Sequence, residues 1–132
     1  MLIRRRRAIS IKILVVDDEE IILEEALEAL TDEGYECFGA SDVEAAVEIV
    51  STTAGIVLIV TDLKMPRKTG ADLINTVETK WGQQIKFIVM SGHASPKVEG
   101  NGVDIAAYPF LRKPLDIDDL IDTVNSVLET SE

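Results

Sequence analysis

The sequence predicts an α/β fold, a doubly wound (βα)5 three-layer sandwich in which helices cover both faces of a five-stranded parallel sheet. Five short apolar runs alternate along the chain with segments whose apolar residues recur mostly at helical spacing. Four of these runs end beside an acid, a hydroxyl or a lysine, and open α/β sheets place their functional residues at such carboxyl ends. Because parallel strands share one direction, we expect these ends to meet at one edge of the sheet.

The first unit is an apolar strand followed by an acidic turn and a helix. Residues 11–16, which follow Ser10, are apolar except for Lys12. The run ends at Asp17 and Asp18. The helix that follows has apolar residues at the spacing i, i+3, i+4 and i+7, namely Leu23, Ala26, Leu27 and Leu30. Its acidic start suits the helix dipole, and Gly34 is a natural C-terminal cap. Capping alone could explain one acid in the turn, but two adjacent acids exceed what a cap needs.

The second and third units lead to the acid at the centre of the chain. Residues 35–40 predict a weaker strand, and Ser41 with Glu44 form a capping-box pattern for the next helix. Its apolar face comprises Val43, Ala46, Val47 and Val50. Residues 56–61 then predict a buried strand that ends abruptly on Asp62. A turn and a third helix follow, marked by Met65, Pro66, Gly70, Leu73, Ile74, Val77 and Trp81.

The fourth and fifth units contain the weakest helix and the strand expected at an edge. Residues 85–90 predict a strand that ends on Ser91. The next segment is a poor helix candidate because it crowds together Pro96, Gly100, Asn101 and Gly102. Residues 106–111 predict the fifth strand, and Pro109 places it at an edge because proline lacks the N–H that a ladder needs. Lys113 follows this strand, and the cap and apolar face of a last helix are Asp116, Ile117, Leu120, Ile121, Val124 and Leu128.

The strand order expected for these units is the flavodoxin-like order 2-1-3-4-5. It places the first and third strands side by side in the middle of the sheet. Asp17, Asp18 and Asp62 would then lie together, and the strand containing Pro109 would lie at the edge.

Composition limits the partners of the domain and its compartment. The chain has 24 acidic and 13 basic residues, a net charge of -11, and this charge repels nucleic acid and anionic lipid. No apolar run approaches the ~20 residues of a membrane span, and the N-terminus lacks the pattern of a signal peptide. The single cysteine, Cys37, cannot form an internal disulfide. We therefore expect a cytoplasmic protein that contacts neither a membrane nor nucleic acid directly.

The chain is expected to hold one folded domain between two tails. Residues 1–10 form a basic N-terminal tail, 11–129 the domain and 130–132 a C-terminal tail. The four arginines Arg4 to Arg7 are typical of a solvated tail. An electrostatic arm for nucleic acid or for an acidic partner is the alternative.

The residues at the strand ends suit phosphoryl transfer onto a carboxylate. Three neighbouring carboxylates need a cation, because like charges raise one another's pKa. Oxygen ligands without histidine or cysteine favour Mg²⁺, which readily accepts a phosphoryl oxygen. Lys113 and Ser91 would complete a cradle for the anion, so that an acid such as Asp62 could attack phosphorus in line.

Four fragments at these strand ends resemble the receiver domain of two-component response regulators. They are Val15-Val16-Asp17-Asp18-Glu19, Thr61-Asp62-Leu63-Lys64-Met65-Pro66 with Gly70, Met90-Ser91-Gly92, and Phe110-Leu111-Arg112-Lys113-Pro114. Each is weak alone, but all four occur in the correct order at predicted strand ends. The resemblance covers the chain from Ile11 to about Leu128.

The resemblance implies a role for each acid. Asp62 is the expected phosphoacceptor, and its donor is a sensor histidine kinase or a phosphotransfer protein. Asp18, Asp62 and the backbone carbonyl of Lys64 would ligate Mg²⁺, with Asp17 holding a coordinated water. Lys113 would pair with the phosphoryl oxygens, and the Lys113-Pro114 peptide would be cis. The domain would be a signalling switch, whose catalysis is limited to its own phosphorylation and dephosphorylation.

The resemblance also implies a conformational switch. Ser91 would bind the phosphoryl group, and Phe110 would turn inward as Ser91 moves. This couples Asp62 to the face formed by the fourth helix, the fifth strand and the fifth helix. Phe110 lacks the hydroxyl of the tyrosine found in many relatives. Lys64 and His93 flank the route of attacking water in relatives, so they are expected to affect the lifetime of the phosphorylated state.

Three other functions are possible on this fold, and the same residues bear on each. A pseudo-receiver that no longer cycles phosphate would not need the full set Asp17, Asp18, Asp62, Ser91 and Lys113. An FMN carrier would need glycines and hydroxyls in the first turn, where this chain has acids. A Mg²⁺-dependent phosphatase would need a cap domain or a substrate pocket. The output domain or target, a homodimer, and whether the chain is a stand-alone regulator or part of a longer protein stay open.

Overall fold

The computed structural model describes residues 10–92 and 102–129. Expectations for the tail arginines, for His93 and for the segment from Pro96 to Asn101 lie outside these residues. Within the described residues the strands are β1 (Lys12–Val16), β2 (Glu36–Ala40), β3 (Ile56–Asp62), β4 (Lys86–Ser91) and β5 (Phe110–Arg112). The helices are α2 (Glu20–Asp32), α3 (Val43–Thr52), α4 (Gly70–Trp81), α5 (Ile117–Glu129) and the short 3-10 helix η1 (Ile105–Ala107).

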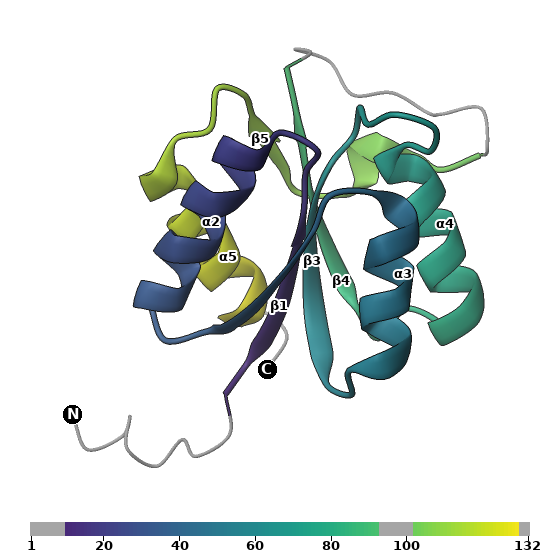
Figure 1. Ribbon diagram of the computed structural model, residues 1–132, viewed down its shortest axis with the longest axis horizontal. Coiled ribbons are helices and arrows are strands. Elements are labelled where there is room, and N and C mark those ends of the chain that lie inside the picture. Colours follow the sequence, from purple (N-terminus) through teal and green to yellow (C-terminus); the bar gives the residue numbers. More distant parts are fainter. Residues whose placement is uncertain (1–9, 93–101, 130–132) are drawn as a thin grey trace.

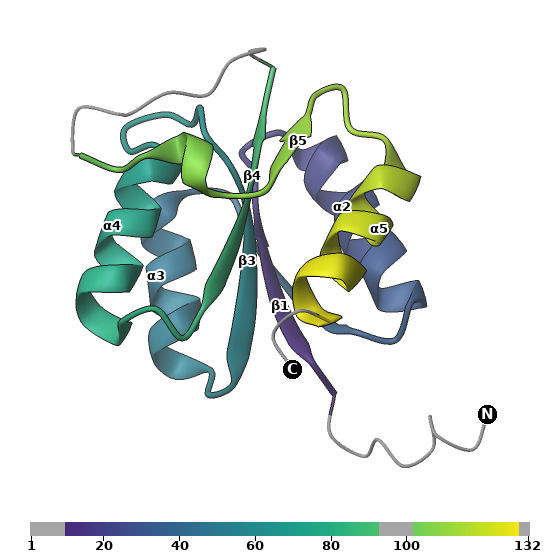
Figure 2. The same cartoon turned by 180° about the vertical axis from the view of Figure 1, so that it is seen from behind.

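The sheet has the predicted order, β2-β1-β3-β4-β5, and every pair of neighbouring strands is parallel. Helices α2 and α5 cover one face of the sheet, and α3 and α4 cover the other (Figures 1 and 2). The fold is therefore the predicted flavodoxin-like three-layer α/β sandwich. Among the described residues, the connection from β4 to β5 contains only η1 as helix.

Two apolar cores lie on the two faces of the sheet because side chains alternate along each strand. Ile13 and Val15 of β1 pack toward α2 and α5, whereas Leu14 and Val16 pack toward α3 and α4. All four are fully buried. Both faces of the central strands are therefore apolar up to the point where the strands end, and polar side chains begin there.

The residues that cap the helices agree in part with those that the sequence predicts. Gly34 follows α2 at a φ of 99°, and the Asp116 side chain accepts hydrogen bonds from the N–H groups of Asp118 and Asp119 at the start of α5. The capping box predicted at Ser41 is wrong. Asp42 caps α3 instead, because its carboxylate accepts the Ala45 N–H at 2.8 Å.

The fifth strand is shorter than predicted. It begins at Phe110, not at residue 106, because the preceding residues form η1 and an extended link. Asp104 caps η1 by accepting the Ala106 N–H, and Pro109 contributes a carbonyl to the Val89 N–H but has no N–H of its own. The edge position predicted for this strand is confirmed. None of the described helices is long and apolar enough to cross a membrane.

Candidate functional site

The predicted aspartates lie together with Ser91 and Lys113 at the carboxyl end of the sheet. Asp17 follows β1, Asp62 is the last residue of β3, Ser91 is the last residue of β4, and Lys113 follows β5. The strand order explains the grouping, because β1 and β4 are the two neighbours of β3. This edge is at the top of the molecule in Figure 1.

The Lys113 ammonium lies between the two buried acids. Its Nζ is 2.9 Å from Asp17 Oδ2 and 3.1 Å from Asp62 Oδ2, and it is 3.7 Å from Glu19 Oε2. Burial alone lowers the pKa of Lys113, but the close approach of the negatively charged Asp17 and Asp62 carboxylates outweighs burial and leaves the pKa above its ordinary value. The lysine therefore stays charged and partly compensates the two carboxylates.

Asp62 is held in an environment that disfavours its charge. Its side chain is 5% exposed, and burial raises its pKa above the ordinary value of 3.8. The hydrogen bond from Lys113 lowers the pKa, the charge of Asp17 raises it, and the net direction is upward. A raised pKa at a buried strand end is typical of functional carboxylates, although structural ion pairs also produce it.

Three carboxylates form a cluster that fits a divalent cation. Asp17, Asp18 and Asp62 each offer an oxygen, and these oxygens all lie within 4.8 Å of one another. Asp17 Oδ1 accepts the Glu19 N–H at 2.9 Å. The buried Asp17 Oδ2 has the Lys113 ammonium at ion-pair distance but no hydrogen bond of acceptable geometry from the described residues. An all-oxygen donor set with an unsatisfied buried carboxylate oxygen suits Mg²⁺.

Ser91 and Phe110 lie on the two strands next to this cluster. Ser91 is 3% exposed, and its carbonyl accepts the Lys113 N–H at 2.9 Å, which ties the ends of β4 and β5 together. Phe110 begins β5 and packs, partly buried, against the core beneath α3 and α4. The two residues are therefore placed on neighbouring strands, Ser91 at the carboxyl end of β4 and Phe110 at the start of β5.

The turn after β3 explains two further signals in the sequence. The Lys64 N–H lies 3.4 Å from Asp62 Oδ1, so the Lys64 backbone is close to the acid. A Cβ atom on Gly70 would lie 2.5 Å from the Asp62 carbonyl oxygen, which leaves room only for glycine. The Lys113–Pro114 peptide bond is cis, as the resemblance implies.

Two residues near the site were missed by reasoning from sequence. The sequence indicates Glu19 only as part of the acidic start of the first helix, but its carboxylate approaches Lys113 Nζ at 3.7 Å. Thr61 is fully buried, and its hydroxyl donates to the Asp62 carbonyl at 2.9 Å. The only signal for Thr61 was its position next to Asp62, because threonine is also an ordinary strand residue.

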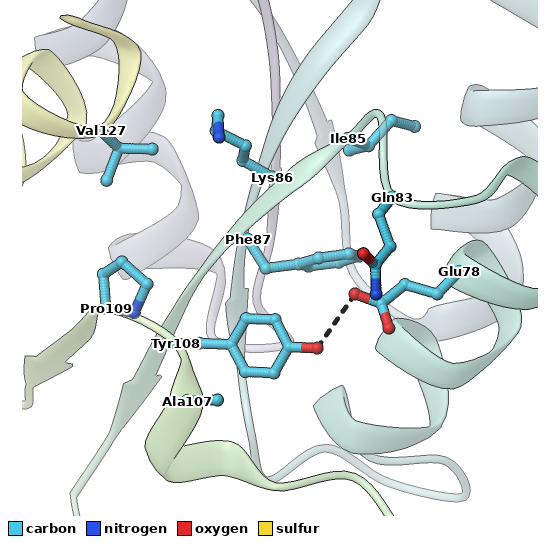
Figure 3. Close-up of a pocket in the computed structure, with 9 residues that line it drawn as sticks. All are labelled: Glu78, Gln83, Ile85, Lys86, Phe87, Ala107, Tyr108, Pro109 and Val127. Carbon is cyan, nitrogen blue, oxygen red and sulfur yellow. Dashed lines mark hydrogen bonds between the residues drawn. The ribbon is translucent and has the colours of Figure 1, made fainter. Parts of the chain in front are cut away.

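A separate pocket of about 370 Å³ lies at the other end of β4. It is lined by Glu78, Gln83, Ile85, Lys86, Phe87, Ala107, Tyr108, Pro109 and Val127. Figure 3 shows Tyr108 pointing toward Glu78, to which its hydroxyl donates a hydrogen bond of 2.9 Å. The aromatic rings of Tyr108 and Phe87 meet edge to face at 6.1 Å. None of the predicted site residues lines this pocket.

Comparison with known proteins finds one family. The model of the response regulator receiver domain matches residues 13–125. The chain is 32% identical over 124 residues to the sensor kinase CckA of Brucella abortus, covering 93% of this chain and 13% of that protein. It is 30% identical over 118 residues to the transcriptional regulatory protein PdtaR of Mycobacterium tuberculosis, covering 89% of this chain and 56% of that protein.

Solved structures agree with these sequence matches. The crystal structure of a response regulator receiver protein from Pseudomonas putida is 33% identical, with a TM-score of 0.78, and the match covers 90% of this chain and 98% of that one. The match thus includes nearly all of that solved chain. By contrast, the chain spans only 13% of CckA and 56% of PdtaR.

Proposed function

The chain belongs to the family of response regulator receiver domains, and from this premise we propose that Asp62 accepts a phosphoryl group from a sensor histidine kinase or a phosphotransfer protein. The observation that supports this most directly is the Lys113 ammonium, 2.9 Å from Asp17 and 3.1 Å from Asp62. An ammonium beside a buried carboxylate provides positive charge where phosphoryl oxygens would arrive.

In the proposed reaction, a carboxylate oxygen of Asp62 attacks the phosphorus of a phosphohistidine. A new P–O bond forms as the P–N bond breaks, and the bonding electrons stay on the imidazole nitrogen of the donor, which takes up a proton. Asp62 is buried among residues held by the sheet, so the attacking oxygen is positioned before the donor binds. After the transfer, Lys113 pairs with the phosphoryl oxygens carried by Asp62 instead of with the free Asp62 carboxylate.

The acids around Asp62 would hold Mg²⁺. Asp18, Asp62 and the Lys64 backbone carbonyl would bind it directly, and Asp17 would hold one of its waters. When bound, Mg²⁺ supplies positive charge to the transferring phosphoryl oxygens. The residues fit this group because all the donors are oxygens, and because Asp17 Oδ2 is buried and lacks a hydrogen bond from the described residues.

We expect the phosphorylated state to be read through β5 and α5. Ser91 would donate a hydrogen bond to the phosphoryl group, and Phe110, on the adjacent strand, would turn inward. The surface that changes would consist of the segment between β4 and β5, β5 itself and α5. Such a switch is a two-state element biased by a local change in charge.

The proposal extends to the role of the chain in the cell. Segments similar to this chain occur in a sensor kinase and in a transcriptional regulatory protein. The same domain can therefore serve different outputs, and function beyond the site does not follow from the fold. A cytoplasmic location rests on the single cysteine.

The proposal is tested by intact-mass spectrometry of the protein after incubation with acetyl phosphate and Mg²⁺. The expected result is a gain of one phosphoryl group that is lost with Asp62→Asn and with a chelator. The same measurement with a phosphorylated histidine kinase as the donor tests for a site that does not react with small donors such as acetyl phosphate. Absence of a gain from both donors, in protein that is folded, would contradict the proposal and leave a pseudo-receiver.

A further inference from the structure

The outer layer formed by α2 and α5 is acidic and has no basic residue of its own. The sequence contains no lysine or arginine from residue 13 to residue 63, or from residue 114 to its end. Both helices lie within these stretches. Their exposed acids include Glu24, Glu25, Glu28, Asp32, Asp118, Asp119 and Asp122.

The basic residues of the folded part do not compensate these acids. Its ion pairs join Arg67 to Asp42, Lys68 to Glu44, and Lys113 to the acids of the site. Within residues 10–92 and 102–129, no ion pair reaches an acid from Glu20 to Glu36 or in α5. The layer therefore has a negative potential that attracts a basic segment.

A groove runs between α2 and α5 in the middle of this acidic layer. It has a volume of about 420 Å³ and is lined by Glu25, Glu28, Ala29, Asp32, Glu33, Ile117 and Ile121. The isoleucines of α5 are partly buried and offer apolar surface, and the acids lie on the α2 side of the groove. This combination fits arginine, whose alkyl stem can cover apolar surface while its guanidinium pairs with a carboxylate.

The chain itself carries a run of four arginines, Arg4 to Arg7, shortly before the folded part begins. Arg4 to Arg7 precede β1, and the Ile11 carbonyl accepts the Glu36 N–H at 2.9 Å. Glu36 lies just beyond the C-terminal end of α2, and β1 begins at the same lower end of the molecule at which α2 ends (Figures 1 and 2). The described chain thus begins at the end of the molecule at which α2 ends, and Glu33, which follows α2, lines the groove.

The tether is long enough for the arginines to span the groove. An extended chain covers about 14 Å from Ile11 to Arg7 and about 25 Å from Ile11 to Arg4. From Glu33 back to Glu25, helix α2 rises only about 12 Å. A short tether also gives the tail a high effective concentration at the groove, of millimolar order.

We propose that Arg4 to Arg7 bind in the groove between α2 and α5 of the same chain. The guanidinium groups pair with Glu25, Glu28, Asp32 and Glu33, and their stems cover Ile117 and Ile121. The tail thereby neutralises part of the acidic layer and covers one outer face of the domain.

The proposal is tested by comparing amide NMR spectra of the full chain with those of a variant in which all four arginines are glutamine. At low salt, shift differences are expected at residues 24–36 and 117–122 and not on α3 or α4. They should vanish in 1 M salt, where the Debye length falls to about 3 Å from about 10 Å at 0.1 M. A four-lysine variant keeps the charge and should retain the shifts.

A second variant separates binding in the groove from general attraction. Replacing Glu28→Gln, Asp32→Asn and Glu33→Gln together should abolish the effect of the arginines on the spectrum. The matched control, Glu44→Gln with Glu48→Gln on α3, should leave it unchanged. Arginine-dependent shifts that are absent, that lie on another face, or that grow with protein concentration because a second copy supplies the tail, would each overturn the proposal.

Discussion

Lys113 determines the electrostatic state of the site. Two carboxylates are buried beside it, and burying a charge is costly unless it is paired. One ammonium compensates two acids only in part, which is consistent with the raised pKa of Asp62. This is the arrangement expected of a site in which binding matters more than stability, since functional residues are often held at a cost to the fold.

Tyr108 provides a test of the electrostatics away from the site. Burial, together with the hydrogen bond to Glu78 and the charges of Glu78 and Asp104, raises the pKa of Tyr108 from 10.0 to about 12. The neutral hydroxyl is thus favoured by folding. Its contribution to stability is complete below pH 10 and should be lost as the pH rises toward 12.

The measurement is an ultraviolet titration of the two tyrosines, Tyr35 and Tyr108. Tyr108→Phe should remove an ionisation near pH 12, whereas Tyr35→Phe should retain it. The Tyr35 hydroxyl donates to Asn125 Oδ1, and burial raises the pKa of Tyr35 as well. If Tyr108→Phe instead loses an ionisation near pH 10, the raised pKa of Tyr108 is contradicted.

Gly70 is predicted to be essential for the packing of the turn below Asp62. In Gly70→Ala the Cβ would meet the Asp62 carbonyl at 2.5 Å and Leu63 Cα at 3.0 Å, both backbone atoms. Overpacking of this kind costs about 1–3 kcal/mol, which outweighs the helix propensity gained from alanine. Urea unfolding should show this loss, while Gly92→Ala, whose Cβ would meet no atom of the described residues within 4 Å, should be near neutral. A stabilised Gly70→Ala would contradict the close approach.

The chemistry at single residues was predictable where a strand end marked it. Asp17, Asp62, Ser91 and Lys113 could be singled out because each ends or follows an apolar run. The approach of Glu19 to Lys113 could not be predicted, because it depends on the directions of two long side chains that a one-dimensional pattern does not contain.

At the scale of elements, the ends of α3 and β5 differ from what the sequence predicts. The capping-box pattern at Ser41 is a common motif, but the neighbouring Asp42 is an equally good cap and takes the role. For β5, residues 106–109 read as strand, yet the Asp104 cap and Pro109 favour η1 and delay the ladder until Phe110. In both places an aspartate side chain, Asp42 or Asp104, caps the backbone and determines the local structure, which the pattern of the sequence predicts differently.

The correction at α3 makes a prediction for a pair of variants. Asp42→Ala removes the acceptor of the Ala45 N–H and the partner of Arg67, so the free energy of unfolding should fall by about 0.5–2 kcal/mol. Most of this comes from the cap, since the Arg67 side chain is 66% exposed and exposed ion pairs contribute little. Ser41→Ala should change the stability by much less. Equal losses in the two variants would restore Ser41 as a cap.

At the scale of the whole molecule, the strand order was predictable because the connections are short and strand-then-helix units cross over with one hand. Once the strand order is known, it follows that the acids at the ends of the first and third strands lie next to each other. The output of the domain was not predictable, because similar segments occur in proteins of different overall length and name.

Binding of a cation should stabilise the whole fold. A ligand that binds only the folded state at 100 times its dissociation constant adds about 2.7 kcal/mol. Urea unfolding in Mg²⁺ should therefore have a higher midpoint than unfolding in a chelator. Asp18→Asn should lose most of this gain, and the surface control Glu44→Gln should keep it. An equal response in Asp18→Asn would place the cation elsewhere on the acidic surface.

The central claim is that Asp62, and not a neighbouring acid, carries the phosphoryl group. It is tested most directly by borohydride reduction of the phosphorylated protein, in which hydride converts an acyl phosphate to an alcohol and releases phosphate. Peptide mass spectrometry should find homoserine at position 62 and aspartate at positions 17 and 18. Homoserine at either of those positions, or at none, would contradict the assignment of Asp62.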